Sequence, residues 1–216
     1  MTNASVLGIF AKQPQPGRVK TRLCPPLTLD QAAELYRCCL KETVHLATRG
    51  DWSTVLFFQG QRRFFKDTFA DVPLAEQIGA DLGERLAQAF ASRFAGGAQQ
   101  VVIIGSDSPD LPVSLIRQAF AGLTHHDAVL APADDGGYVL VGLRRPVPGL
   151  FERIPWSTGE VLAATRKRMV ELQLSCLELS GWYDVDDVVS LRQLVRRSPQ
   201  SVTARLAAQL LGDPHR

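Results

Sequence analysis

The chain alternates between short apolar runs and longer segments whose apolar residues recur at helical spacing. Apolar runs of four to six residues, bounded by turn residues, are typical of buried strands. The predicted strands comprise residues 6–10, 54–58, 101–104, 128–131 and 138–143. Because strands and helices alternate along the chain, we expect an α/β fold: a mainly parallel mixed sheet with helices on both faces.

Apolar residues at intervals of three and four predict the helices between these strands. The first helix is expected to begin near Thr28 or Asp30, both of which are good N-cap residues. Another is expected to open at Ser157, because Ser157 and Glu160 fit a capping box. Further helical patterns cover residues 82–94 and 188–195 and a segment that starts near residue 201. No linker is visible, so residues 1–216 are predicted to form a single domain with a C-terminal helical extension at about 198–213.

Composition excludes several classes of protein. The 216 residues are 45% hydrophobic and 21% charged, with 17 Gly and 13 Pro, which is typical of a globular domain. A net charge of +2 argues against a nucleic-acid partner. No apolar run approaches the ~20 residues of a membrane span, and residues 6–10 are too short for the core of a signal peptide. Four cysteines without a CxxC pair favour a reduced, cytoplasmic, zinc-free protein.

A basic loop follows the first predicted strand. Residues 1–29 contain no Asp or Glu, and their local charge is +4. The four cations are Lys12, Arg18, Lys20 and Arg22. Such a loop at the ligand-binding edge of a parallel sheet is suited to holding phosphates, although a solvated surface loop is the alternative. Neither a P-loop nor a dinucleotide-binding motif fits, because positions 14 and 19 are Pro and Val, and Gly17 stands alone between residues 11 and 23.

Two acidic segments are candidates for a metal site. Asp107 comes directly after the strand at 101–104, where a carboxylate could hold a Mg²⁺ that bridges phosphates. The alternative is a turn whose Asp or Ser side chain caps the helix after Pro112. Further along the chain, Asp184 and Asp186 would face the same side of an extended segment and could meet one cation. Alternatively, Asp186 or Asp187 is only the N-cap of the next helix, and both roles are compatible.

A third acidic segment is a predicted hairpin turn. Asp134 and Asp135 precede Gly136 and Gly137, and Asp-Gly and Gly-Gly pairs supply the positive φ angles of tight turns. A turn favours Asp but does not require two adjacent acids. The segment is therefore either a plain hairpin or part of a functional site.

Six segments together resemble one known family. They are FAKQPQPGRVKTRL at residues 10–23, DLGERL at 81–86, GSDSPDL at 105–111, DDGGY at 134–138, WST at 156–158 and DVD at 184–186. In this order they resemble the rSAM/selenodomain-associated, glycosyltransferase-like family (formerly DUF2064) of the nucleotide-diphospho-sugar transferase, or GT-A, superfamily. The resemblance runs from about residue 6 to residue 195. Guanylyl- and cytidylyltransferases are similar at a greater distance.

The resemblance implies a single Rossmann-like GT-A domain and a role for each matching segment. It implies nucleotide binding by Lys12, Gly17, Arg18, Lys20, Arg22, Asp81 and Arg85. It implies acceptor binding by Gly136, Gly137, Tyr138 and Trp156. Asp107 and Asp186 would be the ligands of Mg²⁺ (or Mn²⁺), with Lys20 and Asp135 as catalytic residues. The loop after the third predicted strand departs from the Asp-x-Asp pattern of most metal-dependent glycosyltransferases, which occurs only at Asp184 and Asp186.

Three functions are consistent with this pattern. The first is glycosyl transfer from a nucleotide-diphospho sugar to a small-molecule acceptor. The second is nucleotidyl transfer from a nucleoside triphosphate to a phosphorylated metabolite, with release of pyrophosphate. Both need cations on phosphate and an acidic metal site. The third is a non-catalytic nucleotide-binding domain, whose affinity for nucleotide would not depend on Mg²⁺. We place the glycosyltransferase first.

Overall fold

The computed structural model describes residues 4–147 and 149–212. The strands are β1 (Ser5–Lys12), β2 (Ser53–Gln59), β3 (Leu74–Glu76), β4 (Gln100–Ile104), β5 (Ala128–Pro132), β6 (Tyr138–Leu143) and β7 (Cys176–Glu178). The α-helices are α1 (Leu29–Ala47), α2 (Arg62–Thr68), α3 (Leu82–Ala95), α4 (Val113–Gly122), α5 (Val161–Glu171), α6 (Val188–Arg197) and α7 (Val202–Leu210). A short 3₁₀ helix, η1 (Thr21–Leu23), precedes α1.

The strands form one mixed sheet in the order β3-β2-β1-β4-β6-β5-β7. Strand β6 runs antiparallel to its neighbours β4 and β5, and every other pair is parallel. The five strands predicted from apolar runs are all present. The two edge strands, β3 and β7, were not predicted, because three residues are too few for a periodic pattern. The expected α/β fold with a mainly parallel sheet is confirmed.

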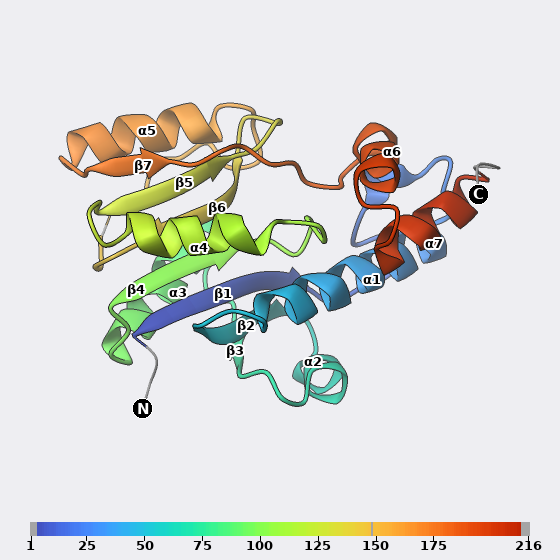
Figure 1. The fold of residues 1–216 in the computed structure, drawn as a ribbon, viewed down its shortest axis with the longest axis horizontal. Coiled ribbons are helices and arrows are strands. Elements are labelled where there is room, and N and C mark those ends of the chain that lie inside the picture. The colour runs from blue at the N-terminus through green and yellow to red at the C-terminus, as the bar shows by residue number, and fades with distance from the viewer. Residues whose placement is uncertain (1–3, 148, 213–216) are drawn as a thin grey trace.

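Helices cover both faces of the sheet (Figure 1). Successive residues of a strand point to opposite faces, so Leu7 and Ile9 of β1 pack with α1, α2 and α4, whereas Val6 packs with α3 and α5. Strands buried on both faces explain the near-continuous apolar runs in the sequence. The polar carboxyl ends of the parallel strands are left for ligands.

The two C-terminal helices form a separate layer beyond the carboxyl ends of the strands, against α1 (Figure 1). Their apolar side chains share a core cluster with Leu35 of α1 and with Tyr183 and Val185 of the β7–α6 segment. The Glu42 carboxylate on α1 accepts hydrogen bonds from the Val202 and Thr203 amides at the start of α7. Helix α7 lies within the expected extension at 198–213, of which residue 213 is outside the described residues.

Local polar contacts decide where the helices begin. Thr28 caps α1, with Gln31 completing the capping box. The prediction that a helix opens at Ser157 is wrong, since α5 begins only at Val161 and Ser157 has a φ of +65°. The Thr158 hydroxyl makes a tight turn instead, donating to the Pro155 carbonyl and accepting from the Glu160 amide. Among the described helices, none is both long and apolar enough to cross a membrane.

Candidate active site

Segments distant in the sequence meet at the carboxyl edge of the sheet. The basic loop, residues 12–22, leaves β1, and Asp107 follows β4. The segment at 182–186 continues the β5–β7 pairing, because Trp182 bridges Ala133 in parallel and its amide donates to the Pro132 carbonyl. The Val185 amide then donates to the Asp107 carbonyl at 2.9 Å. This backbone contact fixes Asp186 beside Asp107.

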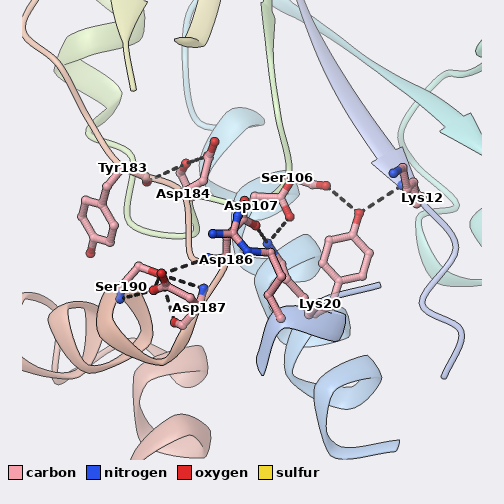
Figure 2. Close-up of polar contacts among 12 residues, drawn as sticks. Lys12, Lys20, Ser106, Asp107, Tyr183, Asp184, Asp186, Asp187 and Ser190 are labelled. Atoms are coloured by element: carbon pink, nitrogen blue, oxygen red, sulfur yellow. Dashed lines mark hydrogen bonds and ion pairs between the residues drawn. The ribbon is translucent and has the colours of Figure 1, made fainter. Parts of the chain in front are cut away.

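The centre of the site is an ammonium group between two carboxylates (Figure 2). The Nζ atom of Lys20 pairs with Asp107 Oδ1 and lies 2.9 Å from Asp186 Oδ1. Because both carboxylates contact one nitrogen, they lie within the ~8 Å that a shared ion or an ion with a bridging water requires. The closeness of Asp107 and Asp186 expected from the sequence is confirmed. Their binding of a metal stays a prediction.

The ammonium group of Lys20 is buried while its two partners are partly open. The Lys20 side chain is 4% exposed, against 37% for Asp107 and 40% for Asp186. Burial would lower the pKa of Lys20, but the carboxylates of Asp107 and Asp186 outweigh it and hold that pKa above its ordinary value. Lys20 therefore stays charged at neutral pH.

A tyrosine forms the wall beside Lys20. The Tyr36 hydroxyl of α1 accepts from the Lys12 amide at 3.0 Å and shares a 2.7 Å hydrogen bond with Ser106 Oγ. Its ring lies beneath the Lys20 ammonium, 5.8 Å from the ring centroid. Burial and then the Asp107 carboxylate raise the pKa of Tyr36, so the phenol is neutral. The contact joins the ends of β1 and β4 through one side chain.

A second buried acid stands behind Asp107. Burial and then the charge on Asp107 raise the pKa of Asp184 above its ordinary value. The Ser108 hydroxyl lies 2.6 Å from Asp184 Oδ1 and 3.0 Å from the Tyr183 carbonyl. Ser108 is the donor toward both acceptors, so its hydroxyl ties the loop after β4 to the segment before α6. Asp184 thus fills a structural position behind the Lys20 cluster.

The two exposed carboxylates fit a divalent cation that also binds phosphate. Among the residues that the structure describes, no group of three or more His, Cys, Asp or Glu side chains is arranged to hold a metal ion. Mg²⁺ commonly takes only one or two carboxylates, with substrate phosphates and waters as the other ligands. Asp107 and Asp186 already converge on one cation, the ammonium of Lys20. Their all-oxygen donor set suits Mg²⁺ or Mn²⁺.

A large pocket opens on one side of this cluster. We call it the basic pocket; its volume is about 630 Å³ and its lining includes Lys12, Arg18, Lys20, Arg85, Asp81, Asp107, Asp186, Gln77 and Trp156. Arg85 is held by the Gly79 carbonyl, to which its Nε donates at 3.0 Å. Asp81 caps α3 through the Glu84 amide. Trp156 lines this pocket, with its indole packed closely against Gly83 of α3, and its predicted role in acceptor binding stays a prediction.

A smaller pocket lies on the other side of Asp186. We call it the acidic pocket; its volume is about 270 Å³ and its lining includes Asp134, Asp135, Asp184, Asp186, Asp187 and Arg22. Arg22 lines this pocket, 4.0 Å from Asp186 Oδ2, and its predicted role in nucleotide binding stays a prediction. Asp187 is the N-cap of α6, and Ser190 completes its capping box. Of the two predicted candidates for this cap, Asp187 is therefore the one that fills the position, and Asp186 is not needed for it.

The remaining predicted residues line neither pocket. Tyr138 packs edge-on against Trp156, and its hydroxyl is buried. Gly136 and Gly137 form the β5–β6 turn, in which the Gly137 amide donates to Asp135 Oδ1 at 2.9 Å. Gly17 lies in an exposed turn with a φ of +74°. Their predicted roles in nucleotide and acceptor binding stay predictions.

Sequence reasoning missed several members of the site. Tyr36 lies on α1, and the residue with which its hydroxyl shares a hydrogen bond, Ser106, is 70 residues away in the chain. Gln77 directly follows β3, and its Nε2 donates to the carbonyls of Ala11 and Phe57. Nothing local in the sequence marks either residue. The predicted alternative for the loop after β4 is wrong as well, because Pro112 is the N-cap of α4 and no side chain caps that helix.

The fold is that of the nucleotide-diphospho-sugar transferases. A crystal structure from Desulfovibrio desulfuricans G20, described as a "putative nucleotide-diphospho-sugar transferase", matches with a TM-score of 0.91 at 34% identity, covering 98% of this chain and 96% of that one. Rv0371c from Mycobacterium tuberculosis H37Rv, in complex with manganese, matches with a TM-score of 0.55 at 18% identity over 91% and 100% of the two chains. A CMP:2-keto-3-deoxy-manno-octonic acid synthetase complexed with CTP gives 0.56 at 11% identity over 91% and 98%.

The sequence also matches the model of a protein family. Residues 42–158 match the profile described as "Uncharacterized protein conserved in bacteria (DUF2064)". This chain belongs to that family. No curated protein matches the sequence.

Proposed function

We propose that this chain is a Mg²⁺- or Mn²⁺-dependent transferase that moves a glycosyl group from a nucleotide-diphospho sugar to a small acceptor. One observation carries the proposal: the Lys20–Asp107–Asp186 cluster lies where a basic and an acidic pocket meet, and Asp186 lines both. The description of the relative that is 34% identical supports the same class of activity.

On the donor side, the basic pocket supplies the contacts that a diphosphate needs. Lys12 and Arg18 present exposed cations, and Lys20 lies deeper in the same pocket. Charge-assisted hydrogen bonds from such groups to phosphate are shorter and stronger than neutral ones. Asp107 and Asp186 would hold the metal ion, which neutralises negative charge on the departing diphosphate when it is bound. Arg85 and Asp81 line the outer part of the pocket.

On the acceptor side, the charge of the pocket selects the acceptor. The carboxylates outnumber Arg22, the cation in the lining of the acidic pocket, so a phosphate-bearing acceptor would be repelled and a neutral hydroxyl compound would not. The acceptor oxygen would form the new bond to the anomeric carbon as the bond from that carbon to the diphosphate oxygen breaks. Asp135 would take the hydroxyl proton, because its carboxylate is exposed in this pocket.

Nucleotidyl transfer is the second candidate. The cations of the basic pocket would suit a triphosphate, and cytidylyltransferases share the fold. In that reaction the phosphate of the acceptor attacks the α-phosphorus of a nucleoside triphosphate, and pyrophosphate leaves. We place it second because its phosphorylated acceptor would have to enter the acidic pocket.

The products of the reaction test the proposal. We expect thermal shifts with nucleotide sugars that grow when Mg²⁺ is added, since a ligand at 100 times its Kd adds ~2.7 kcal/mol of stability. Turnover should release a nucleoside diphosphate, and Asp107→Asn should abolish it while Asp71→Asn, a matched change at an exposed loop, should not. Release of pyrophosphate from a nucleoside triphosphate would establish the second candidate. Nucleotide binding that is indifferent to Mg²⁺, without turnover, would overturn both.

A further inference from the structure

Lys20 occupies the position between the two carboxylates where a divalent cation would bind. Its ammonium contacts one oxygen, Oδ1, of each of Asp107 and Asp186. The other Asp186 oxygen faces Arg22 at 4.0 Å. The pair of acids is thus already neutralised in part by cations of the chain itself, before any ligand arrives.

A metal ion and this ammonium group compete for the same oxygens. Mg²⁺ binds carboxylate oxygens at ~2.0–2.1 Å, which would put it within a few ångströms of Nζ if Lys20 kept its place. Two like charges so close, in a region where Lys20 is 4% exposed, repel each other strongly. The carboxylates are accessible from the pockets, whereas the ammonium lies beneath them. An ion that enters therefore has to displace Lys20 from at least one oxygen.

We expect the side chain of Lys20 to move and the backbone of its loop to stay in place. The backbone of Lys20 has a φ of +49° in the left-handed region, and its carbonyl accepts from the Leu23 amide at 3.0 Å. The neighbours Val19 and Leu23 are buried and anchor the loop on both sides. The flexible four-carbon stem of Lys20 lines the basic pocket, so its ammonium has a route toward the phosphates.

We infer that Lys20 is a built-in counter-cation that holds Asp107 and Asp186 together and is displaced toward the substrate phosphates when the metal ion binds. The inference rests on the proposed function, and it adds that metal and nucleotide bind cooperatively. Metal binds weakly on its own because it has to displace Lys20, and it binds well with a nucleotide that accepts the released ammonium. Lys20 thereby couples the two ligands.

Because of this coupling, replacing Lys20 should raise the affinity for Mn²⁺ alone and lower the affinity for a nucleoside diphosphate. Lys20→Met should bind Mn²⁺ about tenfold or more tightly than wild type in the absence of nucleotide, since the competing charge is gone. The same variant should bind UDP, GDP and CDP, each tested in turn with Mn²⁺, more weakly than wild type. Lys12→Met is the matched control, because it removes another cation of the same pocket. In the part of the chain that the structure describes, Lys12 forms no ion pair with Asp107 or Asp186. Its replacement should therefore change the affinity for Mn²⁺ alone by less than ~2-fold.

Electron paramagnetic resonance of free Mn²⁺ measures these affinities directly, with circular dichroism to check folding and Lys20→Gln as a second variant. The inference is supported if, without nucleotide, the Lys20 variants bind Mn²⁺ more tightly than wild type and Lys12→Met does not. A second outcome is that wild type binds Mn²⁺ together with a nucleoside diphosphate, but the Lys20 variants bind Mn²⁺ alone no more tightly than wild type does. In that case Lys20 is not a counter-cation, although the proposed metal site stands. If no protein binds Mn²⁺ with or without nucleotide, the metal site is wrong and the inference fails with it.

Discussion

The basic and the acidic pocket share Asp186 but differ in how they are built. The basic pocket combines side chains on regular elements (the end of β1, Tyr36 on α1 and the start of α3) with cations and an acid on loops. The acidic pocket is lined by the β5–β6 turn, the segment before α6 and the first turns of α6. The two pockets thus differ in charge and in the elements that carry their side chains. Under the proposed function, this difference predicts that changes in the acidic pocket alter the use of the acceptor and changes in the basic pocket alter nucleotide binding.

The largest expected effect lies on the acidic side. Asp135→Asn should lower kcat by ~10²–10⁴-fold, the usual contribution of a general base, while nucleotide affinity stays near that of wild type. Steady-state kinetics together with calorimetry of nucleotide binding measure the two effects. Asp67→Asn, an exposed acid on α2, is the control. An equal loss of kcat and affinity, with a lowered Tm, would make Asp135 a plain turn residue.

Two cations that are two residues apart, Lys20 and Arg22, should distinguish the functions of the two pockets. Lys20→Ala should weaken nucleotide binding by ~1.5–3 kcal/mol, because it removes a charge-assisted hydrogen bond to phosphate. Arg22→Ala should weaken nucleotide binding less and change the acceptor KM, because its guanidinium lies in the acidic pocket. Calorimetry and initial rates compare them, with Lys66→Ala on the exposed face of α2 as the control. Identical profiles for the two variants would show that the pockets are not functionally distinct.

The turn between β5 and β6 provides a test of the acidic pocket. A Cβ at Gly136 would lie 2.1 Å from the Gly159 carbonyl oxygen, at a φ of +86°. Gly136→Ala should therefore cost ~1–3 kcal/mol of stability and disturb the acceptor more than the nucleotide. Thermal unfolding and both KM values report the outcome. Gly97→Ala, at a similar φ of +90° with open space around it, should cost less. Equal destabilisation would mean that conformation alone, and not contact with Gly159, matters.

The smallest effect is expected far from both pockets. Asp127 lies just before β5, and hydrogen bonds from the Ser175 amide, then from its hydroxyl and from Arg145, lower the pKa of its carboxyl despite partial burial. A lowered folded pKa contributes stability that is present above the unfolded pKa of ~3.9 and is lost as pH falls through the folded value. Asp127→Asn should cost under ~1 kcal/mol at pH 7 and flatten the fall in stability below pH 4. Urea unfolding at pH 3 and 7 measures this, and a change in either KM would contradict it.

The sequence predicted the elements with long periodic patterns and the polar residues next to them. Five apolar runs identified five strands, and the rule that parallel strands end at one edge brought Asp107 and Asp186 together across the chain. It could not identify the two short edge strands or the start of α5, where the Thr158 turn outcompetes a capping box at Ser157. Nor could the sequence show that the predicted residues divide between two pockets, with Trp156 in one and Arg22 in the other. That division depends on contacts between distant segments, such as the packing of the Trp156 indole on Gly83.

The attachment of α6 and α7 to α1 makes the Lys20 cluster depend on contacts outside the sheet. Lys20 and Asp107 lie in segments that follow β1 and β4, whereas Asp186 is placed by a segment whose core contacts include α6 and α7. Helix α7 is held on α1 by the Glu42 carboxylate, which accepts from the Val202 and Thr203 amides. The second carboxylate of Lys20 therefore depends on helices that line the far side of the site from the sheet.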